Sequence, residues 1–162
     1  MTTGLLPPVG FLFSIAGLGL TLAGFSGLVN AFRRGAAWNH TDAFRRRQIP
    51  EMGIFATLLA LTTGPLADSI GNATWAIRFA AVIALAFTMA HSGVLLVRVR
   101  RSQIKQSTQT WIGVVLVNLA VFVAAAVCIV TGGPVLYEWL LIALLTRPMF
   151  AFTLALAEDV TD

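Results

Sequence analysis

Five long apolar segments run through this chain, and they restrict it to one broad class of fold. Each approaches or exceeds the roughly 20 residues that an α-helix needs to cross a hydrocarbon core about 30 Å thick. Lipid offers backbone amides no hydrogen-bond partner, and no strand-like alternation of apolar and polar residues supports a β-barrel. The sequence therefore predicts an all-α integral membrane protein, a five-span transmembrane helix bundle that forms a single domain over residues 1–162. The predicted spans are 9–32, 50–68, 74–97, 111–131 and 134–157.

The composition supports a membrane protein. The chain is 57% hydrophobic and only 11% charged, whereas about 25% of the residues in a soluble domain are charged. The net charge of +4 does not indicate a nucleic-acid surface, because the basic residues sit in two short loops. That distribution is typical of a topology signal, and we expect no nucleic-acid partner.

The last apolar segment leaves one alternative open. It is joined to the fourth segment only by residues 131–134, Thr-Gly-Gly-Pro, which predicts a tight antiparallel hairpin. The alternative is a four-span protein whose last segment lies at the membrane interface. Residues 140–145 and 149–157 are too uniformly apolar for a helix with one wet face, which favours five spans.

The arginines predict the orientation of the chain. The positive-inside rule assigns both basic loops to the cytoplasm. With five spans this places the N-terminus outside and the C-terminus in the cytoplasm of a multi-pass protein, for which we expect the bacterial inner membrane. The loop between the first two spans holds Arg33, Arg34, Arg45, Arg46 and Arg47, and the loop between spans three and four holds Arg98, Arg100, Arg101 and Lys105.

The first basic loop is also a candidate for contact with lipid. Its five arginines, with Trp38 and Phe44, have the character of a site for anionic headgroups. The alternative is that the arginines only determine topology. A short interfacial helix is expected from Thr41, with Asp42 near its positive end.

Small residues line one side of the first span. Ser14, Gly17, Thr21 and Gly24 are spaced by three, four and three residues and so share a helical stripe, the helix-packing seam. Small side chains let helices approach closely, which drives association in lipid. We expect the seam to form an interface within the chain, with a homodimer face as the alternative.

Four polar residues are predicted to lie at one depth in the membrane. At a rise of about 1.5 Å per residue, Arg147 lies about 20 Å along the fifth span, in its inner third. Asn30, Glu51 and His91 fall near the same level. We expect Glu51 to pair with Arg147, with hydrogen bonds from the other two. This ion pair would hold the fifth helix against the bundle. One alternative is that the polar residues form a catalytic or transport site. A second alternative is that Arg147 has no partner and extends its side chain to the lipid headgroups.

A second polar set is expected near the outer face. It comprises Asp68, Arg78 and Glu138, and Arg78, as the only base on that side, is expected to pair with one of the acids. In the fourth span, Asn118 is expected to donate a hydrogen bond to another helix.

No catalytic, cofactor or metal motif is found. His91 is the only histidine within a span, so a haem would need a dimer axis through it, and Cys128 is the single cysteine. The single lysine lies in a loop, which excludes retinal bound in a span. We therefore expect no catalytic residues, no cofactor and no metal, and favour a protein that is not an enzyme.

Three function classes remain open. The first is a non-enzymatic accessory or assembly subunit, or a homo-oligomer, whose work is helix–helix and lipid contact. The second is a small oligomeric transporter or channel, in which Arg147 would indicate an anionic solute. The third is an intramembrane enzyme that modifies lipid, with His91 and Glu51 as acid and base.

Overall fold

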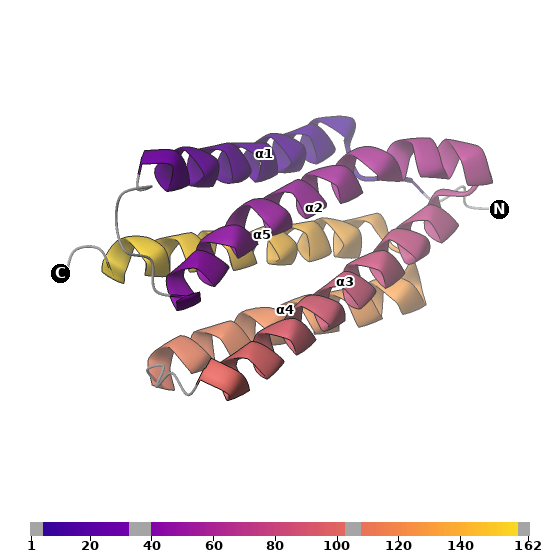
Figure 1. Cartoon of the computed structure of the whole chain (residues 1–162). Helices are drawn as coiled ribbons and strands as arrows, with labels where there is room; N and C mark the ends of the chain where they lie inside the picture. The colour runs from indigo at the N-terminus through magenta and orange to yellow at the C-terminus, as the bar shows by residue number, and fades with distance from the viewer. Residues whose placement is uncertain (1–4, 33–39, 103–107, 159–162) are drawn as a thin grey trace. The chain divides into compact units, whose positions relative to one another are not determined.

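The computed structural model describes residues 5–32, 40–102 and 108–158, and within them every regular element is an α-helix. Each of the five helices contains a stretch of at least 20 residues that is long and apolar enough to cross a membrane. The predicted all-helical chain with five apolar segments is thus confirmed. The helices are α1 (Val9–Phe32), α2 (His40–Ile70), α3 (Ala73–Ser102), α4 (Thr108–Thr131) and α5 (Pro134–Glu158), shown in Figure 1.

The start of α2 corrects one prediction. The helix begins at His40 and continues without interruption through Pro50 to Ile70, so the short helix expected from Thr41 is not a separate element. Hydropathy marks where a chain becomes apolar, which need not be where a helix begins.

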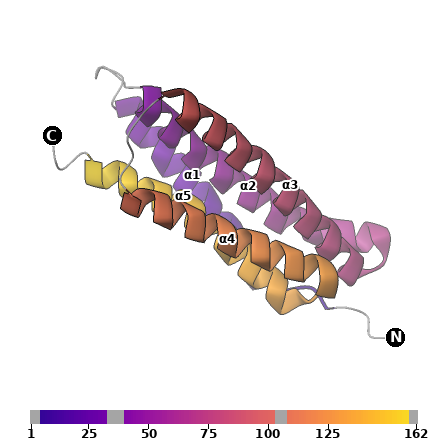
Figure 2. The ribbon, with the colours of Figure 1, turned by 90° about the horizontal axis from the view of Figure 1, so that it is seen from below.

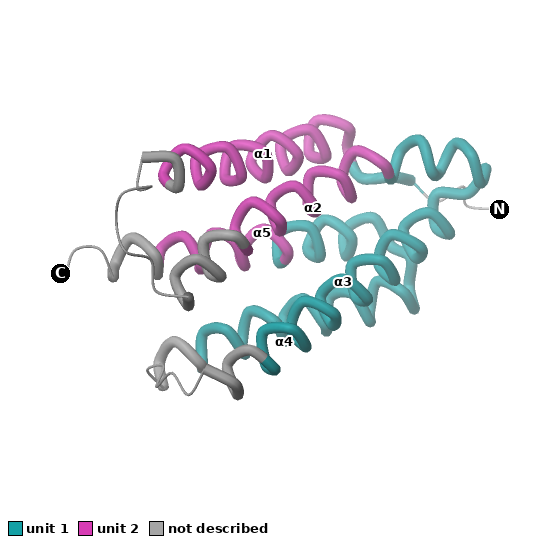
Figure 3. The backbone as a smooth tube through the Cα atoms, in the orientation of Figure 1, with its two compact units in different colours: residues 1–7, 63–143 teal, residues 8–62, 144–162 magenta. Residues whose placement is uncertain are grey.

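The chain divides into two compact units, coloured separately in Figure 3. Unit 1 comprises residues 1–7 and 63–143, and unit 2 comprises residues 8–62 and 144–162. The helices α2 and α5 therefore each contribute one part to each unit. That both units form a single domain stays a prediction.

In unit 1, α3 and α4 pack against each other as an antiparallel pair (Figure 1). Ala76, Ala80 and Ala84 recur every fourth residue of α3, and at most 2% of each is exposed. Val121 and Ala125 of α4 are fully buried as well. Small side chains at helical spacing allow close approach and dense dispersion contact between helices.

Two tight turns in unit 1 depend on glycine. Gly71, between α2 and α3, has a φ of 69°, and Gly132, between α4 and α5, has a φ of 62°. Their backbone N–H groups donate to the carbonyl oxygens of Ala67 (2.8 Å) and Cys128 (2.7 Å), which closes the end of each preceding helix. Only glycine adopts this left-handed conformation without a steric cost.

In unit 2, α1 and the first part of α2 run antiparallel side by side (Figure 2). They cross at Gly19 and Gly53, where a Cβ on Gly19 would lie 2.5 Å from the Gly53 carbonyl oxygen. Thr57 Oγ1 donates to the carbonyl oxygen of Ala16 at 2.9 Å. Without side chains at the crossing, the two backbones lie close enough for this hydrogen bond between helices.

The last part of α5 packs on α1 in the same unit. The rings of Phe25 and Phe152 lie 5.7 Å apart at an interplanar angle of 73°, an edge-to-face arrangement. Aromatic pairs favour this geometry because the positive edge of one ring meets the negative face of the other.

Candidate functional sites

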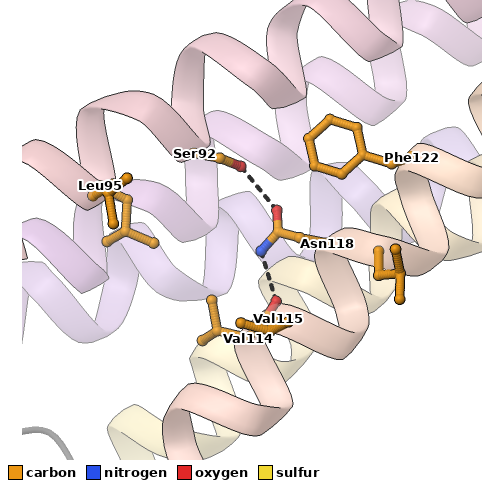
Figure 4. A pocket seen from close by; sticks show the side chains of 8 residues that line it. Ser92, Leu95, Val114, Val115, Asn118 and Phe122 are labelled. Atoms are coloured by element: carbon orange, nitrogen blue, oxygen red, sulfur yellow. Dashed lines mark hydrogen bonds between the residues drawn. The ribbon is translucent and has the colours of Figure 1, made fainter.

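A groove of about 290 Å³ lies between α3 and α4 in unit 1 (Figure 4). Leu96, Val115 and Leu119 are exposed along it, so the groove opens at the surface. None of its lining residues is acidic or basic, and an apolar occupant therefore suits it better than a charged one. The lining residues are Ser92, Leu95, Leu96, Val114, Val115, Asn118, Leu119 and Phe122.

Ser92 and Asn118 supply the polar contact in this groove. Ser92 Oγ donates to Asn118 Oδ1 at 3.0 Å, and Asn118 Nδ2 donates to the carbonyl oxygen of Val114 at 2.7 Å (Figure 4). Asn118 thus joins two helices as predicted, but it accepts the bond between them and donates within its own helix. The pair ties α3 to α4 and contains no group that titrates near neutral pH.

No family model, curated protein or solved structure matches this chain. Function has to follow from the chemistry of its own side chains. Among the described residues, no group of three or more His, Cys, Asp or Glu side chains lies close enough together to hold a metal ion.

The helix-packing seam on α1 is exposed. Ser14, Gly17, Thr21 and Gly24 are all exposed, and a Cβ on either glycine would meet no atom within 4 Å. No described contact covers these four residues, and the expected interface within the chain stays a prediction. At about 100° per residue, Gly19 lies roughly opposite Gly17 on the helix, and it is the Gly19 side that packs on α2.

Arg147 is buried in unit 2, with 6% of its surface exposed. Its Nη1 atom has no hydrogen-bond partner among the described residues. Gln48, in the same unit, is 7% exposed, and its Nε2 atom likewise has no partner there. Two buried nitrogen donors in one unit therefore have unused hydrogen-bonding capacity.

The helix contacts of unit 2 set the levels of these residues along the helix axes. The Gly19–Gly53 crossing aligns α1 with α2, and the Phe25–Phe152 contact aligns α1 with α5. With about 1.5 Å of rise per residue, Arg147 lies within about 2 Å of the level of Glu51 and about 6 Å from that of Gln48. Glu51 itself is exposed, and its pairing with Arg147 stays a prediction.

The other two members of the predicted inner layer are placed differently. His91 belongs to unit 1, where its half-buried ring stacks on Phe87 with centroids 5.9 Å apart. Asn30 lies in α1, but its side chain is outside the described residues. The four-residue layer, including the acid–base pair of His91 and Glu51, stays a prediction.

At the other predicted polar site, Arg78 contacts a helix end and an indole. Its Nη2 donates to the carbonyl oxygen of Val130 at 2.9 Å, and its guanidinium lies 5.2 Å from the centre of the Trp75 ring. A cation suits the negative end of α4, and the indole adds a cation–π contact. Asp68 is exposed and Glu138 is half-buried, and the pairing of either with Arg78 stays a prediction.

The predicted lipid-contact residues of the first basic loop lie outside the part of the chain whose side chains are described. They are Arg33, Arg34, Arg45, Arg46 and Arg47.

Two buried features had no clear signal in the sequence. Tyr137 and Thr63 are fully buried in unit 1, and their hydroxyl oxygens lie 2.5 Å apart in a hydrogen bond. Gln48 stands beside the arginine run and looks like a loop residue by composition. Only the packing of α2 shows that it is enclosed.

Proposed function

We propose that this protein is a multi-pass integral membrane protein that works without catalysis, as a homo-oligomer held together through the seam on α1. The observation that carries the proposal is the exposure of Ser14, Gly17, Thr21 and Gly24. Small residues give α1 a flat face that a second helix can approach closely, and close approach is the main source of helix association in lipid.

The hydroxyl groups on this face are already satisfied. Ser14 Oγ and Thr21 Oγ1 each donate at 2.8 Å to the carbonyl oxygen four residues earlier, of Gly10 and Gly17. The seam is also uncharged, so it holds no ionic group that would require a particular partner. These features support packing by dispersion against a similarly flat surface.

A second copy of the same helix provides such a surface. A twofold axis brings identical stripes together, and twofold dimers are the commonest soluble oligomers. The spacing of Gly17 and Thr21, four residues apart, matches the small-xxx-small pattern of close helix pairs.

The oligomeric mass of the full chain, measured in mild detergent and in lipid nanodiscs, tests the proposal. Gly17→Leu and Gly24→Leu are expected to weaken self-association about tenfold or more, equal to about 1.4 kcal/mol. Gly93→Leu is the matched control, because Gly93 is an exposed helical glycine of α3 with nothing within 4 Å of its Cβ position.

Cross-linking then separates the possible partners. A Ser14→Cys variant is expected to form a disulfide between copies, whereas Leu20→Cys, about 120° from Ser14 round the helix, is not. A monomeric wild type in nanodiscs would overturn the proposal. A different chain that purifies in fixed ratio and is lost in Gly17→Leu would also overturn it, in favour of an accessory subunit.

A further inference from the structure

Unit 2 encloses a cation without a described counter-ion. Arg147 is 6% exposed and lies within a helix that is apolar enough to cross a membrane. A buried charge costs several kcal/mol unless it is paired and hydrogen-bonded, and at membrane depth an ionisable group indicates a functional site.

The unused atoms define the chemistry of the missing group. Arg147 Nη1 and Gln48 Nε2 are both buried and lack a partner among the described residues. Both are donors only, and the guanidinium carries a positive charge. The complementary group is therefore an acceptor with negative charge, which an oxyanion provides.

The levels of the two residues along the helix axes of unit 2 are compatible with one shared oxyanion. Their levels along unit 2 differ by about 6 Å, and two N–H···O bonds of about 2.9 Å each span a similar distance across one anionic group. Gln48 is also the first residue of the apolar stretch of α2. Gln48 thus lies at the boundary of its apolar segment, whereas Arg147 lies inside the apolar stretch of α5.

The sequence next to the donors favours anions as well. Arg45, Arg46 and Arg47 directly precede Gln48, and clustered arginines at a membrane surface attract anionic groups. Among the described side chains of unit 2, Glu51 is the only acid, and it is exposed rather than buried with Arg147.

We propose that Arg147 and Gln48 form a binding site for a phosphate-type oxyanion at the end of unit 2 where α2 becomes apolar. Arg147 supplies the charge, and Gln48 supplies a second hydrogen bond. The oxyanion belongs either to a phospholipid headgroup or to a free phosphate from the adjoining aqueous phase.

Thermal unfolding of the delipidated full-length protein in detergent tests the site. The probes are phosphatidylglycerol, diacylglycerol with the same acyl chains, and sodium phosphate against sodium chloride at equal ionic strength. Ligand that binds the folded state raises the unfolding temperature. Stabilisation by phosphatidylglycerol alone assigns the site to a lipid headgroup, and stabilisation by sodium phosphate as well assigns it to the phosphate group itself.

Variants locate the effect within the protein. Arg147→Gln and Gln48→Leu are expected to raise the concentration for half-maximal stabilisation about tenfold or more, since a hydrogen bond to a charged group contributes on that scale. Arg147→Lys is expected to retain part of the response. Arg78→Gln, which removes an arginine of unit 1, is the matched control and is expected to respond like the wild type.

Three results would overturn the proposal. The first is no stabilisation of the wild type by any phosphate-bearing probe. The second is an unchanged response in Arg147→Gln. The third is a strong coupling between the effects of Arg147→Gln and Glu51→Gln on the free energy of unfolding, in a wild type that retains no phosphorus. That result would assign Glu51 as the counter-ion of Arg147. The response of the wild type to phosphatidylglycerol compared with diacylglycerol tests the proposal even if a variant does not fold.

Discussion

Gly19 of α1 and Gly53 of α2 face each other so closely that a Cβ on either residue would lie 2.5 Å from the carbonyl oxygen of the other. The neighbouring hydrogen bond from Thr57 to Ala16, 2.9 Å long, is formed across this crossing. Two glycines in separate helices therefore set the distance between α1 and α2.

Replacing Gly53 with alanine is expected to destabilise the protein. The new methyl group would overlap backbone rather than a flexible side chain, so the helices must separate, at a cost of about 1–3 kcal/mol. Unfolding in detergent, followed by circular dichroism, measures this change. Gly64→Ala in the same helix is the control, because nothing lies within 4 Å of its Cβ position. Equal stability of the two variants would contradict the close crossing.

Replacing Tyr137 with phenylalanine is expected to cost about 0.5–2 kcal/mol, because it removes a buried hydrogen bond to Thr63. A double-mutant cycle with Thr63→Val isolates the pair. The two substitutions together are expected to cost less than the sum of the single changes, by at least about 0.5 kcal/mol. Additive costs would show that the two hydroxyl groups do not interact.

The two turn glycines are expected to differ in their tolerance of alanine. Both have a positive φ, which costs a residue with a Cβ about 1–2 kcal/mol. At Gly71 nothing lies within 4 Å of the added atom, whereas at Gly132 it would overlap the Thr74 side chain. The unfolding free energy of Gly132→Ala is therefore expected to fall further than that of Gly71→Ala. The reverse order would mean that the contact with Thr74 is absent.

The predicted topology is testable by thiol labelling in intact membranes. Cys128 is fully buried and is expected to give little background. By the positive-inside rule, Gly35→Cys and Gln103→Cys are expected to react with an impermeant maleimide from the same side, and Thr3→Cys from the opposite side. Labelling of Gly35→Cys and Gln103→Cys from opposite sides would refute the five-span orientation.

Some contacts could be anticipated from residue type but not in detail. Asn118 was expected to bond another helix, and it does so through Ser92, yet as the acceptor. An asparagine side chain both donates and accepts, so its sequence position alone cannot decide which atom faces the neighbour. Arg147 stands out in the sequence as a charged residue in an apolar run. Its burial, like that of Gln48, depends on how the helices pack within unit 2.

The sequence by itself determined that the chain forms five apolar helices and nearly where they lie, because hydrophobic length and helix geometry are local properties of a segment. Which face of each helix is covered was decided only by tertiary structure. Gly17 and Gly19 are equally small, yet Gly19 is buried against α2 and Gly17 is exposed. Small residues mark a face that permits close packing, but the neighbour that occupies it is set by the rotation of the whole helix in the fold.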